Sequence, residues 1–87
     1  MSHYNGHMET ELAGNLLRLA AAYSAAKRLS EGTVGRLSAS DTRFFSRIRG
    51  GKTFTAKKYD EVVHWFAARW PDDAPWPDDV IRPKVAA

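Results

Sequence analysis

The chain has 87 residues, no cysteine, and a net charge of +3 from 13 basic and 10 acidic residues. This length allows one domain, and the lack of cysteine excludes disulfides and thiolate metal sites. No apolar run approaches the roughly 20 residues that span a bilayer, and no secretory signal opens the chain. We therefore expect a cytoplasmic protein without a metal or other cofactor.

The N-terminal region divides into an arm and a helix. Residues 1–8 show no hydrophobic periodicity and are interpreted as a tag remnant or disordered arm outside the domain. The first predicted helix covers about residues 10–29, with Thr10 as its N-cap. Its apolar residues recur at helical spacing and mark one buried face: Leu12, Leu16, Leu19, Tyr23 and Ala26.

A short helix is predicted next, over residues 31–37, with Ser30 as its N-cap. Its apolar residues Val34 and Leu37 lie one turn apart. Gly35 either weakens this helix or is small because another backbone passes close to it.

A polar turn at residues 38–40 leads into a second short helix, over about residues 40–49, capped by Ser38 or Ser40 and ended by the glycines at 50 and 51. Asp41 is interpreted as a helix-capping acid. One side of this helix is apolar and is expected in the core: Phe44, Phe45 and Ile48. The other side is polar and basic: Thr42, Arg43 and Ser46, with Arg47 and Arg49 at its edges.

The last predicted helix starts after Thr55 as N-cap and stops at Pro71. Its apolar residues follow helical spacing: Tyr59, Val62, Val63, Phe66 and Trp70. Residues 71–87 form an acidic, proline-rich tail in which the sequence WPDD, first seen at 70–73, recurs at 76–79. Three apolar tail residues would be costly to leave in water, so at least part of the tail is expected to pack back or meet a partner: Trp76, Val80 and Ile81.

Charge is separated along the chain. Residues 12–58 have 10 basic and 2 acidic residues, a net charge of +8, whereas the remainder has 3 basic and 8 acidic residues, a net charge of −5. A basic body of this kind is typical of a protein that binds a polyanion. The acidic tail either covers this basic body in the absence of a ligand or is structural.

The predicted order is a long helix, a short helix, a tight turn, a second short helix and an amphipathic helix. Over residues 12–70 this all-α arrangement of four to five helices resembles the phage-repressor-like helix-turn-helix family, of the lambda repressor and Cro type. Ser38 or Ala39 stands where the family usually has a glycine. Two alignments with the family, one residue apart, are therefore open for the second short helix. The resemblance rests on the apolar positions of the two short helices and on the run SRIRGG: Val34, Leu37, Phe44, Phe45 and residues 46–51.

The resemblance implies that residues 9–70 are the DNA-binding domain of a small transcriptional regulator. It also implies that helix 40–49 enters the major groove of double-stranded DNA. It implies a homodimer on a two-fold site with half-sites about 34 Å apart. Base contacts are then expected from Thr42, Arg43, Ser46 and Arg47. Phosphate contacts are expected from the surrounding polar residues: Ser40, Arg49, Lys52, Thr53, Lys57 and Lys58.

Two other functions fit parts of the chain. A protein-interaction module would use the tail of Trp, Pro and Asp residues, and a non-specific nucleoid or single-strand binder would use the charge alone but leaves Thr42 and Ser46 unexplained. Catalysis is not expected, because the sequence offers no cysteine nucleophile, no grouping of Ser, His and acid, and no glycine-rich phosphate loop.

Overall fold

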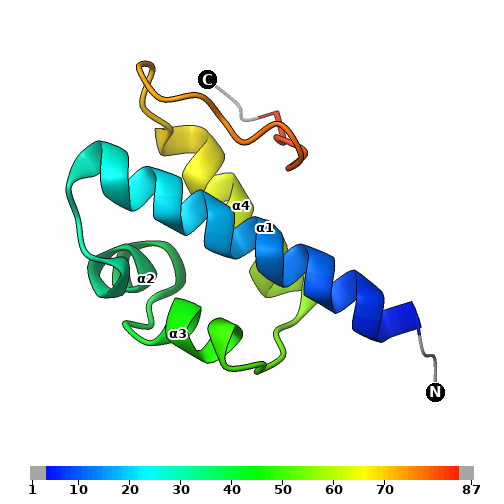
Figure 1. Ribbon diagram of the computed structural model, residues 1–87. Coiled ribbons are helices and arrows are strands. Elements are labelled where there is room, and N and C mark those ends of the chain that lie inside the picture. The colour runs from blue at the N-terminus through cyan, green and yellow to red at the C-terminus, as the bar shows by residue number, and fades with distance from the viewer. Residues whose placement is uncertain (1–3, 85–87) are drawn as a thin grey trace.

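The computed structural model describes residues 4–84, with side chains from residue 9 onward. In this part of the chain there are four helices and no strand, which confirms the all-α class: α1 (Tyr4–Lys27), α2 (Glu31–Ala39), α3 (Phe44–Arg49) and α4 (Ala56–Arg69). Figure 1 shows α1 crossing the molecule, with α2 and α3 on one side of it and the C-terminal segment on the other. None of the helices in residues 4–84 is long and apolar enough to cross a membrane.

The first helix begins at Tyr4, six residues before the expected start. Thr10 therefore lies inside α1 and is not its N-cap, and the backbone of residues 4–8 is helical where the sequence suggested an arm. Adding a residue to an existing helix costs little compared with nucleating one, so the packed part of α1 can extend past the cap-like residues. Residues 1–3 of the expected arm lie outside the described part.

The hydrophobic core lies where the four helices meet. The expected faces of α1 and α4 are largely confirmed, but Ala26, in the last turn of α1, is exposed, and Ala20 is buried in its place. Leu37 is 43% exposed, so Val34 alone of the two expected α2 residues enters the core. The largest fully buried side chains come from all four helices: Leu16, Leu19, Val34, Phe45, Val62 and Phe66.

The turn between α2 and α3 lies later than expected. Ser30 caps α2 as predicted, by accepting a hydrogen bond from the Thr33 N–H at 3.1 Å. The helix continues to Ala39, however, and Ser40 ends it in the left-handed conformation at φ 57°. The expected capping roles of Ser38 and Ser40 for α3 are therefore wrong, because both serines belong to the end of α2.

The turn itself is built by Asp41. Its carbonyl accepts the Phe44 N–H at 3.0 Å, and its side-chain Oδ1 accepts the Arg43 N–H at 3.0 Å. This is the local pairing by which Asp favours turns. As a result α3 starts at Phe44 and not near residue 40.

Gly35 of α2 lies close to the backbone of this turn. A Cβ atom added to Gly35 would lie 2.6 Å from the carbonyl oxygen of Asp41, and the Gly35 carbonyl accepts the Asp41 N–H at 3.3 Å. Of the two explanations for this glycine, the structure supports the close passage of another backbone.

The two WPDD copies form the same hydrogen bond. In each copy the tryptophan Nε1–H donates to the carbonyl four residues later, Trp70 to Ala74 at 2.9 Å and Trp76 to Val80 at 2.7 Å. The two indole rings also meet, with centroids 4.8 Å apart. Val80 is buried and Trp76 packs against the core, whereas Ile81 is 90% exposed.

Candidate nucleic-acid interface

α3 has two different sides, as the sequence predicts. Phe44, Phe45 and Ile48 face the core with exposed fractions of 8%, 0% and 5%, and the two phenylalanine rings meet edge to face at 5.1 Å. The remaining residues of α3 are exposed. Burial of the aromatic side therefore fixes which side chains of this helix face solvent.

The four residues expected to contact bases divide between the turn and the helix. Thr42 and Arg43 lie in the turn before α3, and Ser46 and Arg47 lie within α3. The expectation that all four lie on one helix is wrong, because the Asp41 turn occupies residues 41–44. All four are nevertheless exposed, and the Ser46 hydroxyl donates to the Arg43 carbonyl at 3.1 Å, which ties the turn to the helix.

The residues expected to contact phosphates are only partly brought together. Three of the six, Lys52, Thr53 and Lys58, line a cleft of about 280 Å³ between α3, the following loop and the start of α4. Arg47, which is expected to contact bases, lines the same cleft. The cleft has an apolar floor, formed by Phe44, Ile48 and Phe54. The other three expected residues do not line it: Ser40, Arg49 and Lys57.

Two arginines of α3 are held by the only two acids of the basic segment. Arg47 pairs with Asp41 through Nη1 and Oδ2. Arg49 pairs with Glu31 through two N–H groups, one of which, on Nη1, lies 3.1 Å from Oε2. This second pair joins the end of α3 to the start of α2 and spans 18 residues of sequence, so local sequence patterns do not reveal it.

The Glu31–Arg49 pair also changes the titration of both groups. The hydrogen bond from the Arg49 guanidinium lowers the pKa of Glu31 below its ordinary value, although partial burial opposes this effect. The same hydrogen bond raises the pKa of Arg49. Arg49 therefore has a carboxylate partner within the domain in addition to the phosphate role that the sequence suggests.

Other cations of the basic segment have no such partner. Within residues 9–84, no carboxylate oxygen lies within 4 Å of the charged nitrogens of Arg36, Arg43, Lys52 or Lys57, whereas Lys58 lies 3.5 Å from Glu61. All four of these cations are exposed. Arg36, on α2, is a further exposed cation, to which the sequence patterns assign no contact with DNA.

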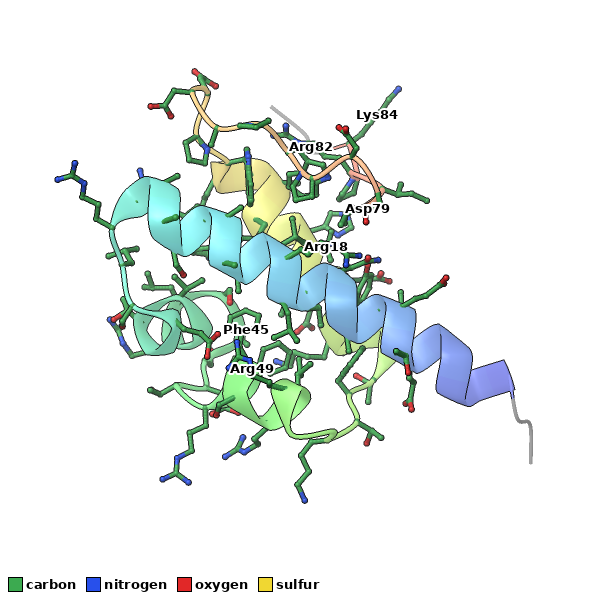
Figure 2. All side chains as sticks on the ribbon, viewed as in Figure 1. Arg18, Phe45, Arg49, Asp79, Arg82 and Lys84 are labelled. Carbon is green, nitrogen blue, oxygen red and sulfur yellow. The ribbon has the colours of Figure 1, made fainter. Side chains whose placement is uncertain are left out.

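The acidic tail and the candidate interface on α3 lie on opposite sides of α1. Figure 2 shows Asp79, Arg82 and Lys84 on one side of this helix, and Phe45 and Arg49 on the other. Asp79 lies 3.4 Å from Arg18 of α1, and Arg82 donates to the Ala67 carbonyl at 3.0 Å. The described part of the tail therefore packs on α1 and α4, and the arrangement supports a structural role over covering of the basic surface.

Comparison of the chain with models of protein families, with curated proteins and with solved structures gives no match. The assignment of a function therefore rests on this chain's own residues. Among the described residues, no three His, Asp or Glu side chains gather in a way that could hold a metal ion.

Proposed function

We propose that this protein binds double-stranded DNA at specific sequences, as a small transcriptional regulator of the phage-repressor-like helix-turn-helix class. One observation carries the proposal. The Asp41 turn passes close to Gly35 of α2, and residues 42–47 of the turn and α3 form a polar and basic edge whose polar side chains are exposed and whose two phenylalanines are buried in the core.

The size and chemistry of this edge suit a major groove. The six residues of α3 form about 9 Å of helix, and the groove, about 12 Å wide, admits an α-helix. Arg43 and Arg47 can each donate two hydrogen bonds to the O6 and N7 atoms of guanine, and the Thr42 and Ser46 hydroxyls can bond to any base edge. Three exposed cations of the basic segment would neutralise phosphates: Arg36, Lys52 and Lys57.

A single domain of this size buries too little surface for tight specific binding. We therefore include in the proposal a homodimer on a two-fold site, with its half-sites about one helical turn, or 34 Å, apart. Two copies bound together would double the base contacts and account for specificity in so small a chain.

The alternative of a protein-interaction module is less favoured by the packing of the tail. Trp70 is 7% exposed, and both Trp70 and Trp76 use their indole N–H groups on carbonyls of the same tail. These aromatic side chains would have to leave their present contacts before they could anchor a partner. Ile81 is the large apolar side chain of the described tail that is exposed and could anchor a partner without leaving the core.

The proposal is tested by a triple variant, Thr42→Ala, Arg43→Ala and Ser46→Ala. Its binding to duplexes selected by the wild-type protein is compared with its binding to random duplexes, by fluorescence anisotropy. We expect the preference for selected duplexes to fall at least tenfold, since one bidentate arginine–guanine contact contributes about 1–3 kcal/mol of discrimination.

A matched control is Lys84→Ala, which removes one positive charge on the other side of α1 (Figure 2). It should keep the wild-type preference. Specific binding that survives in the triple variant would contradict the proposed function.

A further inference from the structure

We propose that Asp41 is a specificity-determining residue, whose carboxylate suppresses binding to DNA that offers phosphates without the correct bases. The inference rests on the proposed function. It starts from an unexpected feature, a carboxylate in the middle of a surface otherwise suited to a polyanion: Asp41 is the one acidic residue lining the cleft that Arg47, Lys52 and Lys58 also line.

The two carboxylate oxygens of Asp41 have different partners. Oδ1 accepts the backbone N–H of Arg43 at 3.0 Å, and Oδ2 pairs with Nη1 of Arg47. The Asp41 side chain is 29% exposed, compared with 52% for Arg47. The carboxylate is therefore held at both oxygens, with one bond shaping the turn that carries Arg43 and the other neutralising a cation of α3.

This arrangement weakens the cleft as a phosphate site. A phosphate that enters must compete with Asp41 for Arg47 and must approach the negative charge of the carboxylate. Lys58 already lies 3.5 Å from Glu61. Among the three cations of the cleft, Lys52 is thus the one without a carboxylate within 4 Å in the described part of the chain.

Base recognition suffers much less from the same pair. A guanidinium has five N–H donors, so Arg47 keeps donors for a base edge while Asp41 fixes its direction. Non-specific binding, in contrast, depends almost entirely on phosphate contacts. Through its Oδ1 bond Asp41 also orients Arg43, so both of its contacts raise the ratio of specific to non-specific affinity.

The variant Asp41→Asn separates the two contacts, because the amide keeps an oxygen that can accept the Arg43 N–H but loses the charge that neutralises Arg47. With a random-sequence duplex, we expect Asp41→Asn to bind about three- to tenfold more tightly than the wild type at 100 mM salt, with a log–log salt slope steeper by about 0.9 for one additional phosphate contact. With a selected duplex, the affinity should change less than about twofold, because base contacts fix the register.

Two further variants complete the experiment. Asp79→Asn makes the same change of charge at the pair with Arg18, on the other side of α1 from α3 (Figure 2), and should leave the slope for random duplex close to that of the wild type. Asp41→Ala removes both contacts, so it should weaken binding to the selected duplex while strengthening binding to the random one. Melting temperatures show whether each variant is folded at the assay temperature.

The outcomes distinguish this inference from the proposed function. If the wild-type protein binds random and selected duplexes and Asp41→Asn has the wild-type affinity and slope for both, Asp41 has no such role. An equal gain on both duplexes would also overturn it, because the ratio would then be unchanged. Failure of the wild-type protein to bind any duplex at 50 mM salt would overturn the proposed function itself, and this inference with it.

Discussion

Replacing Gly35 with alanine tests the packing that sets α3 against α2. The added Cβ would lie 2.6 Å from the Asp41 carbonyl oxygen, whereas ordinary contact begins at 3.4 Å, so the two atoms must separate by about 0.8 Å. Asp41 cannot move freely by this amount. Its N–H is bonded to the Gly35 carbonyl at 3.3 Å and its carbonyl accepts the Phe44 N–H at 3.0 Å.

The expected loss of stability follows from these contacts. Overpacking in a well-packed region costs about 1–3 kcal/mol, and loss of one backbone hydrogen bond costs about 1 kcal/mol. The better helix propensity of alanine offsets about 1 kcal/mol. Gly35→Ala should therefore lower the free energy of unfolding by about 1–3 kcal/mol, and the melting temperature of a domain of this size by about 4–8 °C for each kcal/mol.

Gly14→Ala in α1 is the matched control, measured like Gly35→Ala by urea denaturation and thermal melting followed by circular dichroism. Its Cβ would meet the Arg18 guanidinium at 3.3 Å, the far end of a flexible side chain that can move away. It should therefore leave stability unchanged or raise it by up to about 1 kcal/mol. The reasoning is refuted if Gly35→Ala is as stable as the wild-type protein, or if both variants lose the same stability.

Other predictions concern the ion pairs and the tail. Because Arg49 lowers the pKa of Glu31 below its ordinary value of 4.5, this pair stabilises the fold fully above that ordinary value, and its contribution is lost as the pH falls through the lower folded value. Urea denaturation from pH 6 to pH 3 should thus show a steeper loss in the wild-type protein than in Glu31→Gln, and equal profiles would contradict the pair. Trp76→Ala removes a ring packed on the core and its bond to the Val80 carbonyl, and should cost about 2–4 kcal/mol in the same assay. Ending the chain after Pro71 should lower the melting temperature, and a truncated protein that melts like the wild type and binds random duplex more tightly would show that the tail covers the basic surface.

Much of the helical core was predictable because α1, α3 and α4 each have a periodic apolar side, whereas in α2 Leu37 is exposed and only Val34 of the expected pair is buried. The burial of Phe45 and Ile48 follows from their spacing alone, and Ser30 and Thr55 act as N-caps, each accepting a backbone N–H from three residues later. For Gly35 the sequence left two explanations open, and the structure supports one of them, the close approach of another backbone.

The boundaries of α3 were less predictable because three neighbouring residues carry similar capping signals. Ser38, Ser40 and Asp41 can each start a helix or end a turn, and the choice depends on where α2 meets the turn in three dimensions. The predicted start of α1 failed for a related reason, because Thr10 resembles a cap but lies inside a longer helix.

The polar contacts of the candidate interface were the least predictable part. The Glu31–Arg49 pair joins residues 18 apart, and the sequence shows only that acids are rare in this segment. The repeated WPDD sequence was visible, but its use as a turn closed by an indole N–H depends on side-chain geometry. Such contacts come from the packing of elements that are distant in sequence. The sequence therefore shows which residues can form ion pairs or hydrogen bonds, but not which residues they contact.

Selection of bound duplexes from a random DNA library at about 150 mM salt tests the proposed function most directly, because weak phosphate-only binding is largely suppressed at this salt concentration. We predict enrichment of a two-fold symmetric motif with half-sites about one helical turn apart, and loss of that enrichment in the Thr42→Ala, Arg43→Ala, Ser46→Ala variant. Retention of duplexes without any enriched motif, or no retention at all, would contradict sequence-specific DNA binding.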